Sequence, residues 1–193
     1  MTESVQHKII ILTAPSGAGK TSVKSRLLNT LKKELSFSVS ATTRKMRGNE
    51  KEGVDYHFIN EEAFKELVAT NSFVEWEMVY QGLYYGTTIA EINRIWGEGK
   101  VPVLDIDVKG ALNVKKKYGN DVLSIFIEPP SIEVLKERLI KRGTDSEENI
   151  LMRINKAGEE ISYKSMFDRV VLNDDIERAS SEVVALVQQF IAN

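Results

Sequence analysis

A loop of small residues between an apolar run and a helical pattern constrains this chain of 193 residues more than any other feature. Residues 8–14 form the apolar run, and residues 20–35 carry helical spacing. Between them the chain reads Ala14-Pro15-Ser16-Gly17-Ala18-Gly19-Lys20-Thr21. A strand, a glycine-rich loop and a helix in this order are typical of α/β units that bind phosphate.

The chemistry of this loop follows from its residue types. Gly17 and Gly19 permit a turn that points backbone N–H groups at an anion, and the following helix adds its positive end. We expect Lys20 to bridge the terminal phosphates of a nucleotide and Thr21 to hold Mg²⁺. The usual pattern begins with glycine, so Ala14 leaves open whether the first turn of the loop has standard geometry.

A glycine-rich turn that binds nothing is the alternative, and the strand before it and the helix after it make that alternative weak. The loop does not specify a reaction, because ATPases, GTPases and many small-molecule kinases share it. We expect the phosphates of ATP to be surrounded by Ala14, Pro15, Ser16, Gly17, Ala18, Gly19, Lys20, Thr21 and Ser22.

Composition excludes several classes of protein. The formal net charge is −2, which gives no electrostatic case for a nucleic-acid partner. The chain has no cysteine, which excludes a thiolate zinc site and a thiol nucleophile. No apolar run approaches the ~18 residues of a membrane span. We therefore expect a cytoplasmic protein without a membrane partner.

The apolar patterns predict an α/β fold. Residues 8–14, 101–106 and 122–127 look like strands buried on both faces, and residues 169–172 are a plausible fourth strand. Separated by helical patterns, they predict a central parallel sheet with helices on both faces. The predicted helices cover residues 20–35, 61–70, 89–96, 131–141, 147–167 and 176–191.

Two segments depart from the alternation of buried strands and helices. Residues 40–89 contain shorter strand patterns at 55–59 and 73–79, punctuated by glycines, and predict an inserted mixed α/β lobe. Residues 131–167 are mostly helical and dense in both charges, and predict a movable helical lid. The core then comprises residues 1–39, 90–130 and 168–193 of a single domain spanning residues 1–193.

The lobe contains a cluster of motifs: Ser40 to Glu50, Asp55-Tyr56-His57-Phe58, Phe73-Val74-Glu75-Trp76, Tyr84-Tyr85-Gly86-Thr87 and, after the lobe, Leu104-Asp105-Ile106-Asp107. Together with the phosphate loop they resemble guanylate kinases, a family of phosphate-loop nucleoside monophosphate kinases. The resemblance extends to Asn173-Asp174 and covers nearly the whole chain. It implies transfer of the γ-phosphoryl group of ATP to GMP, and to dGMP, with Mg²⁺, by a monomer or homodimer.

The first motif also makes chemical sense without the family. Planar guanidinium groups at Arg44 and Arg47, with the phenol of Tyr56 downstream, suit phosphate oxygens. A solvated basic turn offset by Glu50 and Glu52 is an equally weighted alternative. By resemblance, the phosphate of GMP is held by Arg44, Arg47, Tyr56 and Tyr85.

Two carboxylates are candidates for recognising a purine base through hydrogen bonds. Glu75 lies in an apolar setting and Asp107 ends a strand, where doubly wound sheets bind ligands. Ionised carboxylates only accept hydrogen bonds, so they match the N1–H and exocyclic amine of guanine, while the hydroxyls of Ser40 and Thr87 can serve O6. The alternatives are a surface residue paired with a lysine for Glu75 and a helix N-cap for Asp107.

Asp105 lies two residues before Asp107, so on a strand both point to the same side. One interpretation is that Asp105 organises a water on Mg²⁺, as the acidic residue of other phosphate-loop enzymes does. In the family that the chain resembles, serine stands at the position of Thr87, so the hydroxyl is kept.

Three arginines mark the lid. Arg138 and Arg142 lie on one helical face and Arg153 follows on the next helix, although surface ion pairing would explain isolated arginines. By resemblance these three close over the transferring phosphoryl group and act with Lys20 and Arg44 in catalysis. Asn173 matches a family position beside the adenosine of ATP.

The sequence leaves two other interpretations of the function open. One is a non-catalytic guanylate-kinase-like module whose monophosphate pocket holds a phosphopeptide, disfavoured by the intact phosphate loop. The other is a kinase of another nucleotide or a small alcohol, disfavoured by Glu75 and Asp107. His7 and His57 are isolated and predict no metal site, and residues 115–117 are interpreted as a solvated helix face.

Overall fold

A five-stranded parallel sheet lies at the centre of the protein. The structure is a computed structural model that describes residues 7–143 and 146–193; residues 1–6 of the expected core and 144–145 of the expected lid lie outside it. The strand order is β2-β7-β1-β8-β9. These strands are β1 (Ile9–Thr13), β2 (Leu35–Phe37), β7 (Val101–Asp105), β8 (Val122–Glu128) and β9 (Arg169–Leu172).

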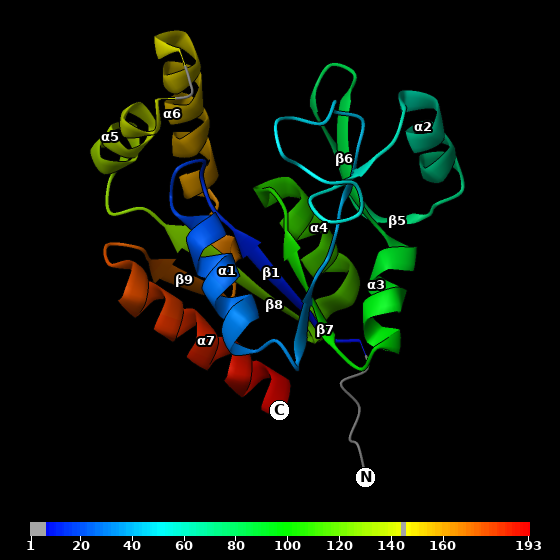
Figure 1. Ribbon diagram of the computed structural model, residues 1–193. Coiled ribbons are helices and arrows are strands. Elements are labelled where there is room, and N and C mark those ends of the chain that lie inside the picture. Colours follow the sequence, from blue (N-terminus) through cyan, green and yellow to red (C-terminus); the bar gives the residue numbers. More distant parts are fainter. Residues whose placement is uncertain (1–6, 144–145) are drawn as a thin grey trace.

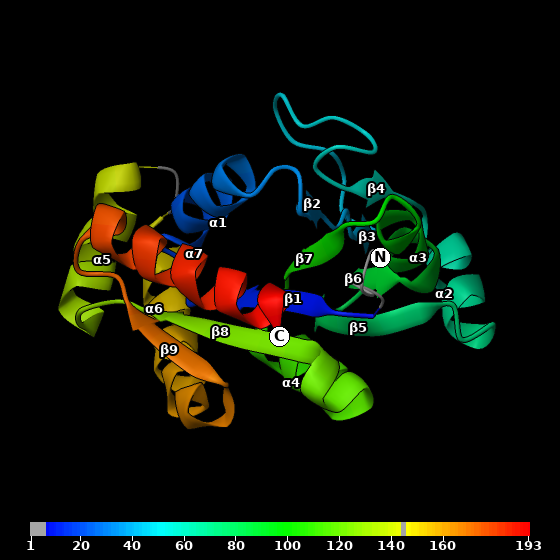
Figure 2. The same ribbon diagram turned by 90° about the horizontal axis from the view of Figure 1, so that it is seen from below.

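Helices cover both faces of this sheet. α1 (Lys20–Thr30) and α7 (Ile176–Ala192) lie on one side, and α3 (Ile89–Gly97) and α4 (Val108–Tyr118) pack against the other, as Figure 2 shows for α1, α7 and α4. In β1, Ile10 and Leu12 face the α1 and α7 side, whereas Ile9 and Ile11 face α3 and α4. A strand covered on both faces must be apolar throughout, so the predicted parallel α/β architecture is confirmed.

A second sheet stands apart from the first (Figure 1). Its order is β4-β3-β6-β5, and the helix α2 (Glu61–Ala69) packs on it. Phe64 of α2 stacks on Phe73 with ring centroids 4.5 Å apart. A Cβ at Gly86 would lie 2.8 Å from the Phe73 ring, so this packing requires glycine there. The strands are β3 (Ala41–Thr42), β4 (His57–Phe58), β5 (Phe73–Tyr80) and β6 (Leu83–Thr88).

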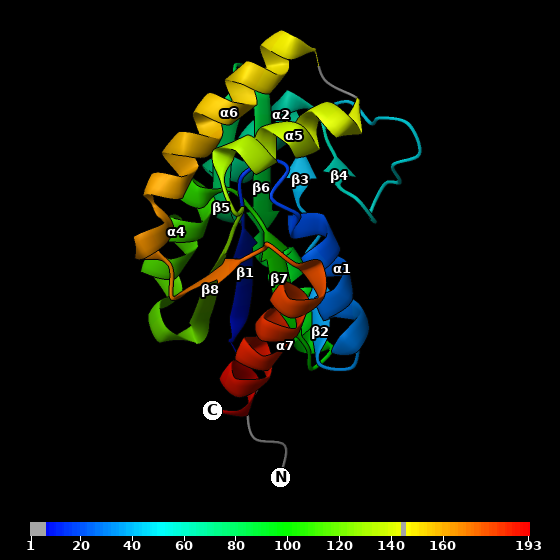
Figure 3. The ribbon, with the colours of Figure 1, turned by 90° about the vertical axis from the view of Figure 1, so that its left-hand side faces the viewer.

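Helices α5 (Ile132–Arg142) and α6 (Glu147–Ser162) lie together at the end of the molecule opposite the end of α7 (Figure 3). Leu135 and Leu139 of α5 and Ile150 and Ala157 of α6 join the core cluster that contains the phosphate-loop residue Ala18. The side chain of Arg142 lies outside the described part of the chain. No helix among the residues described is both long and apolar enough to span a membrane.

Two predicted helices differ from the structure. The helix predicted over 20–35 ends at Thr30, and Leu35 begins the unpredicted edge strand β2. Leu27, Leu31 and Leu35 keep a four-residue spacing that mimics one continuous helix. The segment predicted as one helix over 147–167 divides into α6 and a short 3₁₀ helix, η2 (Lys164–Met166); a second, η1 (Gly119–Asp121), precedes β8.

Helix α4 was not among the predicted helices. Its buried stripe consists of Val108, Ala111 and Val114, which a glycine and three lysines obscure in the sequence. Lys115 is not a freely solvated residue, because its ammonium group lies 2.5 Å from the carboxylate of Asp168. That ion pair ties α4 to the start of β9.

Candidate active site

A cavity of about 790 Å³ opens where the two sheets and the α5–α6 pair meet. Most of the residues expected from sequence border it, from eight separate parts of the chain. They are Ala14, Pro15, Ser16, Gly17, Gly19, Lys20, Thr21, Ser40, Tyr56, Glu75, Tyr85, Asp105, Asp107, Arg138 and Arg153. The expected residues that the structure describes but does not place on its wall are Ala18, Ser22, Arg44, Arg47, Thr87 and Asn173.

The phosphate loop joins β1 to α1. Gly17 and Gly19 both have φ near +90°, a conformation that L side chains rarely adopt, and Gly19 caps the start of α1. Among the described residues other than glycine, only His7 and Asn71 have positive φ. The backbone at Ala14 therefore has an ordinary φ, and this loop does not require a glycine at its first position.

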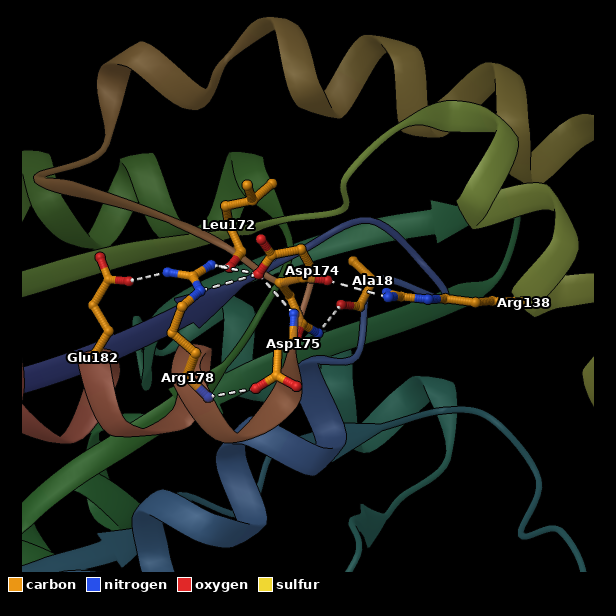
Figure 4. A network of polar contacts seen from close by, with 8 residues as sticks. Ala18, Arg138, Leu172, Asp174, Asp175, Arg178 and Glu182 are labelled. Carbon is orange, nitrogen blue, oxygen red and sulfur yellow. Dashed lines mark hydrogen bonds and ion pairs between the residues drawn. The ribbon is translucent and has the colours of Figure 1, made fainter.

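Asn173 supports the loop from beneath. Its side chain is 3% exposed, and Nδ2 donates a 2.6 Å hydrogen bond to the carbonyl oxygen of Ala18. Its own carbonyl oxygen accepts from Nη2 of Arg138 at 3.1 Å, and Figure 4 shows Arg138 reaching this corner beside Ala18. The structure thus buries Asn173 under the phosphate loop. Its position beside the adenosine of ATP stays a prediction.

An arginine network holds the turn that carries Asn173. Arg178, at the start of α7, donates to the carboxylate of Asp174 and to the carbonyl oxygen of Leu172, and pairs with Glu182 (Figure 4). Asp174 in turn accepts from the backbone N–H of Asp175. These bonds fix the junction between β9 and α7 on which the loop rests.

Lys20 and Asp105 meet on the cavity wall. Lys20 Nζ lies 2.5 Å from Asp105 Oδ1, and Lys24 Nζ lies 2.7 Å from Oδ2. Burial alone would raise the pKa of Asp105, but the two lysine charges outweigh it and hold the pKa below its usual value. Sequence reasoning missed Lys24, although its position one helical turn after Lys20 was a usable signal.

The oxygen donors beside the loop fit a magnesium ion shared with phosphates. Thr21 presents an exposed hydroxyl in the first turn of α1, and the carboxylate of Asp105 faces the same cavity. Mg²⁺ in phosphoryl-transfer sites takes one or two protein oxygens and completes its shell with phosphate and water. Within residues 7–143 and 146–193, no group of three or more His, Cys, Asp or Glu could hold a metal by itself.

Glu75 and Asp107 form the other end of the cavity. Glu75 is 7% exposed, and its Oε1 accepts from the backbone N–H of Thr87 at 3.0 Å and from the Thr87 hydroxyl at 2.7 Å. Burial raises the pKa of Glu75 to about 7, with a further contribution from the charge of Asp107. Glu75 is therefore a buried carboxylate within the site, and the alternative of a surface strand residue is wrong.

Thr87 has a different position from the one expected, whereas Asp107 combines both of its expected positions. Thr87 is fully buried behind Glu75 and donates its hydroxyl to that carboxylate, so here it orients Glu75 and does not face the cavity. Asp107 caps α4 by accepting from the backbone N–H of Gly110 at 2.8 Å, and it also borders the cavity. For Asp107 the N-cap alternative and the site position hold together.

Arg44, two residues after β3, is paired with Glu50. Arg44 is 8% exposed and makes two hydrogen bonds to Glu50, of 2.7 and 2.9 Å, which raise its pKa. Its guanidinium lies 5.2 Å from the ring centroid of Tyr56, which contacts Tyr85 edge to face. Arg47 is exposed on the turn, and only its backbone N–H bonds to Glu50.

One lid arginine, Arg153, contacts the phosphate loop directly, whereas Arg138 bonds to Asn173 beneath it. Nη1 of Arg153 donates to the Ser16 hydroxyl at 2.5 Å, which connects α6 directly to the loop. Leu139, one residue after Arg138, packs 3.2 Å from where a Cβ on Gly17 would lie. Arg142 ends α5, but its side chain lies outside the described residues, so its role stays a prediction.

Comparison with known proteins decides the family. The model of the guanylate kinase family matches residues 6–190. The chain belongs to the guanylate kinase family. The guanylate kinase of Porphyromonas gingivalis is 48% identical over 185 residues, covering 96% of this chain and 98% of the relative. That of Salinibacter ruber is 43% identical, covering 97% and 98%.

A solved structure agrees with this assignment. The crystal structure of guanylate kinase from Anaplasma phagocytophilum superposes with a TM-score of 0.74 at 31% identity, covering 94% of this chain and 85% of that one. The predicted family, fold and enzyme class, a nucleoside monophosphate kinase, are confirmed. Residues outside the recognised guanylate kinase motifs also border the site, among them Glu77, Lys156 and Glu160.

Proposed function

We propose that the protein transfers the γ-phosphoryl group of ATP to GMP, and also to dGMP, giving ADP and GDP or dGDP. One observation carries the proposal: a single cavity has Lys20 and the phosphate loop on one wall and the buried carboxylate of Glu75 beside Asp107 on another. The first wall suits a triphosphate, and the second suits a base that donates hydrogen bonds.

The carboxylates select guanine over adenine. The N1–H and exocyclic amine of guanine donate to Glu75 and Asp107, whereas N1 of adenine is an acceptor and would face a carboxylate unfavourably. A buried polar group left unpaired rejects a wrong substrate by roughly 10⁴-fold. The hydroxyl of Ser40, which borders the cavity, is available to O6. Tyr56 and Tyr85 with Arg44 behind them receive the GMP phosphate, with Arg47 on the adjoining turn.

Catalysis then consists of positioning and charge stabilisation. An oxygen of the GMP phosphate attacks the γ-phosphorus directly, so no side-chain nucleophile is needed. Lys20 moves from Asp105 to the phosphates, and Arg138 and Arg153 stabilise the charge that spreads over the transferring group. We place Arg142 with them. Thr21 would hold a Mg²⁺ ion that arrives with ATP, and Asp105 would hold it through a water; the metal would supply positive charge to the phosphate oxygens.

The moving parts follow the same division as the fold. Residues 40–89 serve as the GMP lobe and residues 131–167 as the lid, and their closure over the core excludes water that would otherwise hydrolyse ATP. We further propose that the enzyme acts in the cytoplasm, in purine nucleotide metabolism, as a monomer or homodimer without a nucleic-acid or membrane partner.

A substrate panel tests the proposal. ADP formation is measured in a coupled assay with ATP, Mg²⁺ and each of GMP, dGMP, AMP, CMP and UMP. Turnover with GMP at least a hundredfold above that with AMP, CMP and UMP is expected. Faster turnover with another nucleotide would contradict the assignment of the base, and absence of turnover with all five would favour the phosphopeptide-binding alternative.

A further inference from the structure

Asp105 is held by two lysines on separate oxygens. Lys20 Nζ lies 2.5 Å from Oδ1 and Lys24 Nζ lies 2.7 Å from Oδ2. Both lysines come from the first two turns of α1, and Asp105 is the last residue of β7. The proposed function assigns Lys20 to the phosphates of ATP and gives Lys24 no role.

Lys24 is fixed by its surroundings. Its side chain is only 17% exposed, and its ammonium group lies 4.1 Å from the ring centroid of Phe37 on the edge strand β2. A cation over an aromatic face is attracted to the ring, more strongly when it is partly desolvated. Contacts with Phe37 on one side and Asp105 on the other hold Lys24 in one place before any ligand arrives.

Lys24 lies outside the cavity wall. Lys20 and Asp105 both border the cavity, whereas Lys24 is absent from the residues that line it within the described chain. Its ammonium group reaches the site through the far oxygen of Asp105. A direct contact with the triphosphate is therefore not what the geometry favours.

Binding of ATP creates a competition for Lys20. The ammonium group that moves to the phosphates must give up its contact with Asp105 Oδ1. The Asp105 side chain is 18% exposed, and a largely buried carboxylate without a cationic partner is costly. Lys24 remains on Oδ2 and compensates that charge, which makes the release of Lys20 easier.

We propose that Lys24 is a positioning residue for ATP: it retains and orients Asp105 when Lys20 transfers to the triphosphate. This inference rests on the proposed function, because it takes ATP as the ligand of the phosphate loop. Without Lys24, Asp105 would hold Lys20 as its remaining partner, and ATP would have to displace a stronger ion pair.

A double-mutant cycle tests this role. The dissociation constant of ATP is measured by calorimetry in EDTA for the parent, Lys24→Met, Asp105→Asn and the double variant. Lys24→Met should weaken ATP binding about tenfold in the parent background and less than twofold in Asp105→Asn, because the two side chains act as a unit. Lys24→Arg should restore most of the affinity.

Three controls make the result specific. The dissociation constant of GMP, measured for the same variants, should change less than twofold and reports that the fold is intact. Lys32→Met removes an exposed lysine just beyond α1 and should leave ATP binding unchanged. The parent is also assayed for phosphorylation of GMP, so failure of the proposed function is detected independently.

Two outcomes would overturn the inference. An equal loss of ATP affinity in both backgrounds would show that Lys24 acts directly on the triphosphate through its charge. Unchanged ATP affinity in Lys24→Met would show that Lys20 leaves Asp105 without help. Either result, with active parent enzyme, removes the role of Lys24 and leaves the proposed function standing.

Discussion

Glu75 approaches Gly110 so closely that no side chain fits between them. A methyl group on Gly110 would place its carbon 2.7 Å from Oε2 of Glu75 and 3.3 Å from Oδ1 of Asp107. The two carboxylates that read the base in our proposal thus converge over the first turn of α4. Gly110 makes this convergence possible, since a buried helical position would otherwise favour alanine.

Gly110→Ala should separate stability from recognition. The added methyl group pushes the Glu75 carboxylate out of position, so the Michaelis constant for GMP should rise about tenfold or more, while that for ATP stays within twofold. The free energy of unfolding should fall little, or rise by up to about 1 kcal/mol, because alanine is the better helix former. Steady-state kinetics and thermal unfolding measure the two effects.

Gly158→Ala is the matched control for that substitution. Gly158 also lies inside a helix, but its nearest neighbour, Cδ1 of Ile132, would be 4.0 Å from the new methyl carbon. It should show the gain in helix propensity without the loss of GMP affinity. A normal Michaelis constant for GMP in Gly110→Ala would mean that the carboxylates tolerate the methyl group and that their spacing is not critical.

The raised pKa of Glu75 predicts how GMP recognition depends on pH. Burial raises this pKa to about 7, so the free protein binds a proton at Glu75 as the pH falls through 7. A protonated carboxyl group offers a donor towards the donor edge of guanine. The kcat/KM for GMP should therefore fall up to tenfold per pH unit below about pH 7, while the Michaelis constant for ATP changes less.

The phosphate of GMP also binds a proton, near pH 6, and this lowers kcat/KM as well. Glu75→Gln distinguishes the two effects, because it removes the carboxyl group and leaves the substrate unchanged. The variant should have a lower kcat/KM for GMP at pH 8, and the remaining fall of kcat/KM at acid pH should be centred near pH 6.

Glu75 also makes the stability of the protein depend on pH. In the parent, the folded state retains the Glu75 proton that the unfolded chain loses between pH 4.5 and 7, so the free energy of unfolding falls as the pH rises through that window. Glu75→Gln should thus stabilise at pH 8 by roughly 1–3 kcal/mol and not at pH 4. In the kinetic experiment, a fall of kcat/KM that stays centred near pH 7 in Glu75→Gln would show that another group is responsible for it.

Much of the fold and part of the site follow from local sequence patterns. The loop from Ala14 to Thr21 identifies itself through its glycines and its neighbours, and Ile9–Thr13 reads as a strand buried on both faces. β2 and α4 were missed for a physical reason: Leu31 and Leu35 continue a helical spacing, and the buried stripe of α4 is short and interrupted by Gly110. In both cases tertiary packing decides what the local pattern leaves ambiguous.

The missed site residues share another property, since their roles arise from contacts between distant segments. Gly110 and Glu75 are 35 positions apart, and no local sequence pattern around either residue predicts that they approach each other. Asn173 reaches Ala18 across 155 positions, and this supporting contact was not predicted from the sequence, whereas its contact with ATP stays a prediction. Lys24 could have been noticed, because it follows Lys20 by one helical turn.

Asn173→Ala should weaken ATP binding through the phosphate loop. The substitution removes the 2.6 Å bond to Ala18 and leaves a buried carbonyl oxygen without its donor, at a cost of about 1–3 kcal/mol. The dissociation constant of ATP should rise about tenfold, that of GMP should stay within twofold, and calorimetry measures both. Asn120→Ala, at an exposed position before β8, is the control. A normal dissociation constant for ATP would mean that the loop keeps its shape without Asn173.

Lys20→Met should abolish turnover while leaving GMP binding largely intact. Lys20 is the cavity-wall cation that leaves Asp105 for the moving phosphoryl group, so its loss removes charge stabilisation from the transition state and should lower kcat at least about a hundredfold. The GMP end of the cavity, at Glu75 and Asp107, is untouched, so calorimetry should give a dissociation constant for GMP within threefold of the parent. Lys33→Met, an exposed lysine beyond α1, should have parental kinetics. Equal rates of GMP phosphorylation in Lys20→Met and parent would end the catalytic role of Lys20, and weakened GMP binding would instead show that the two ends of the cavity are coupled.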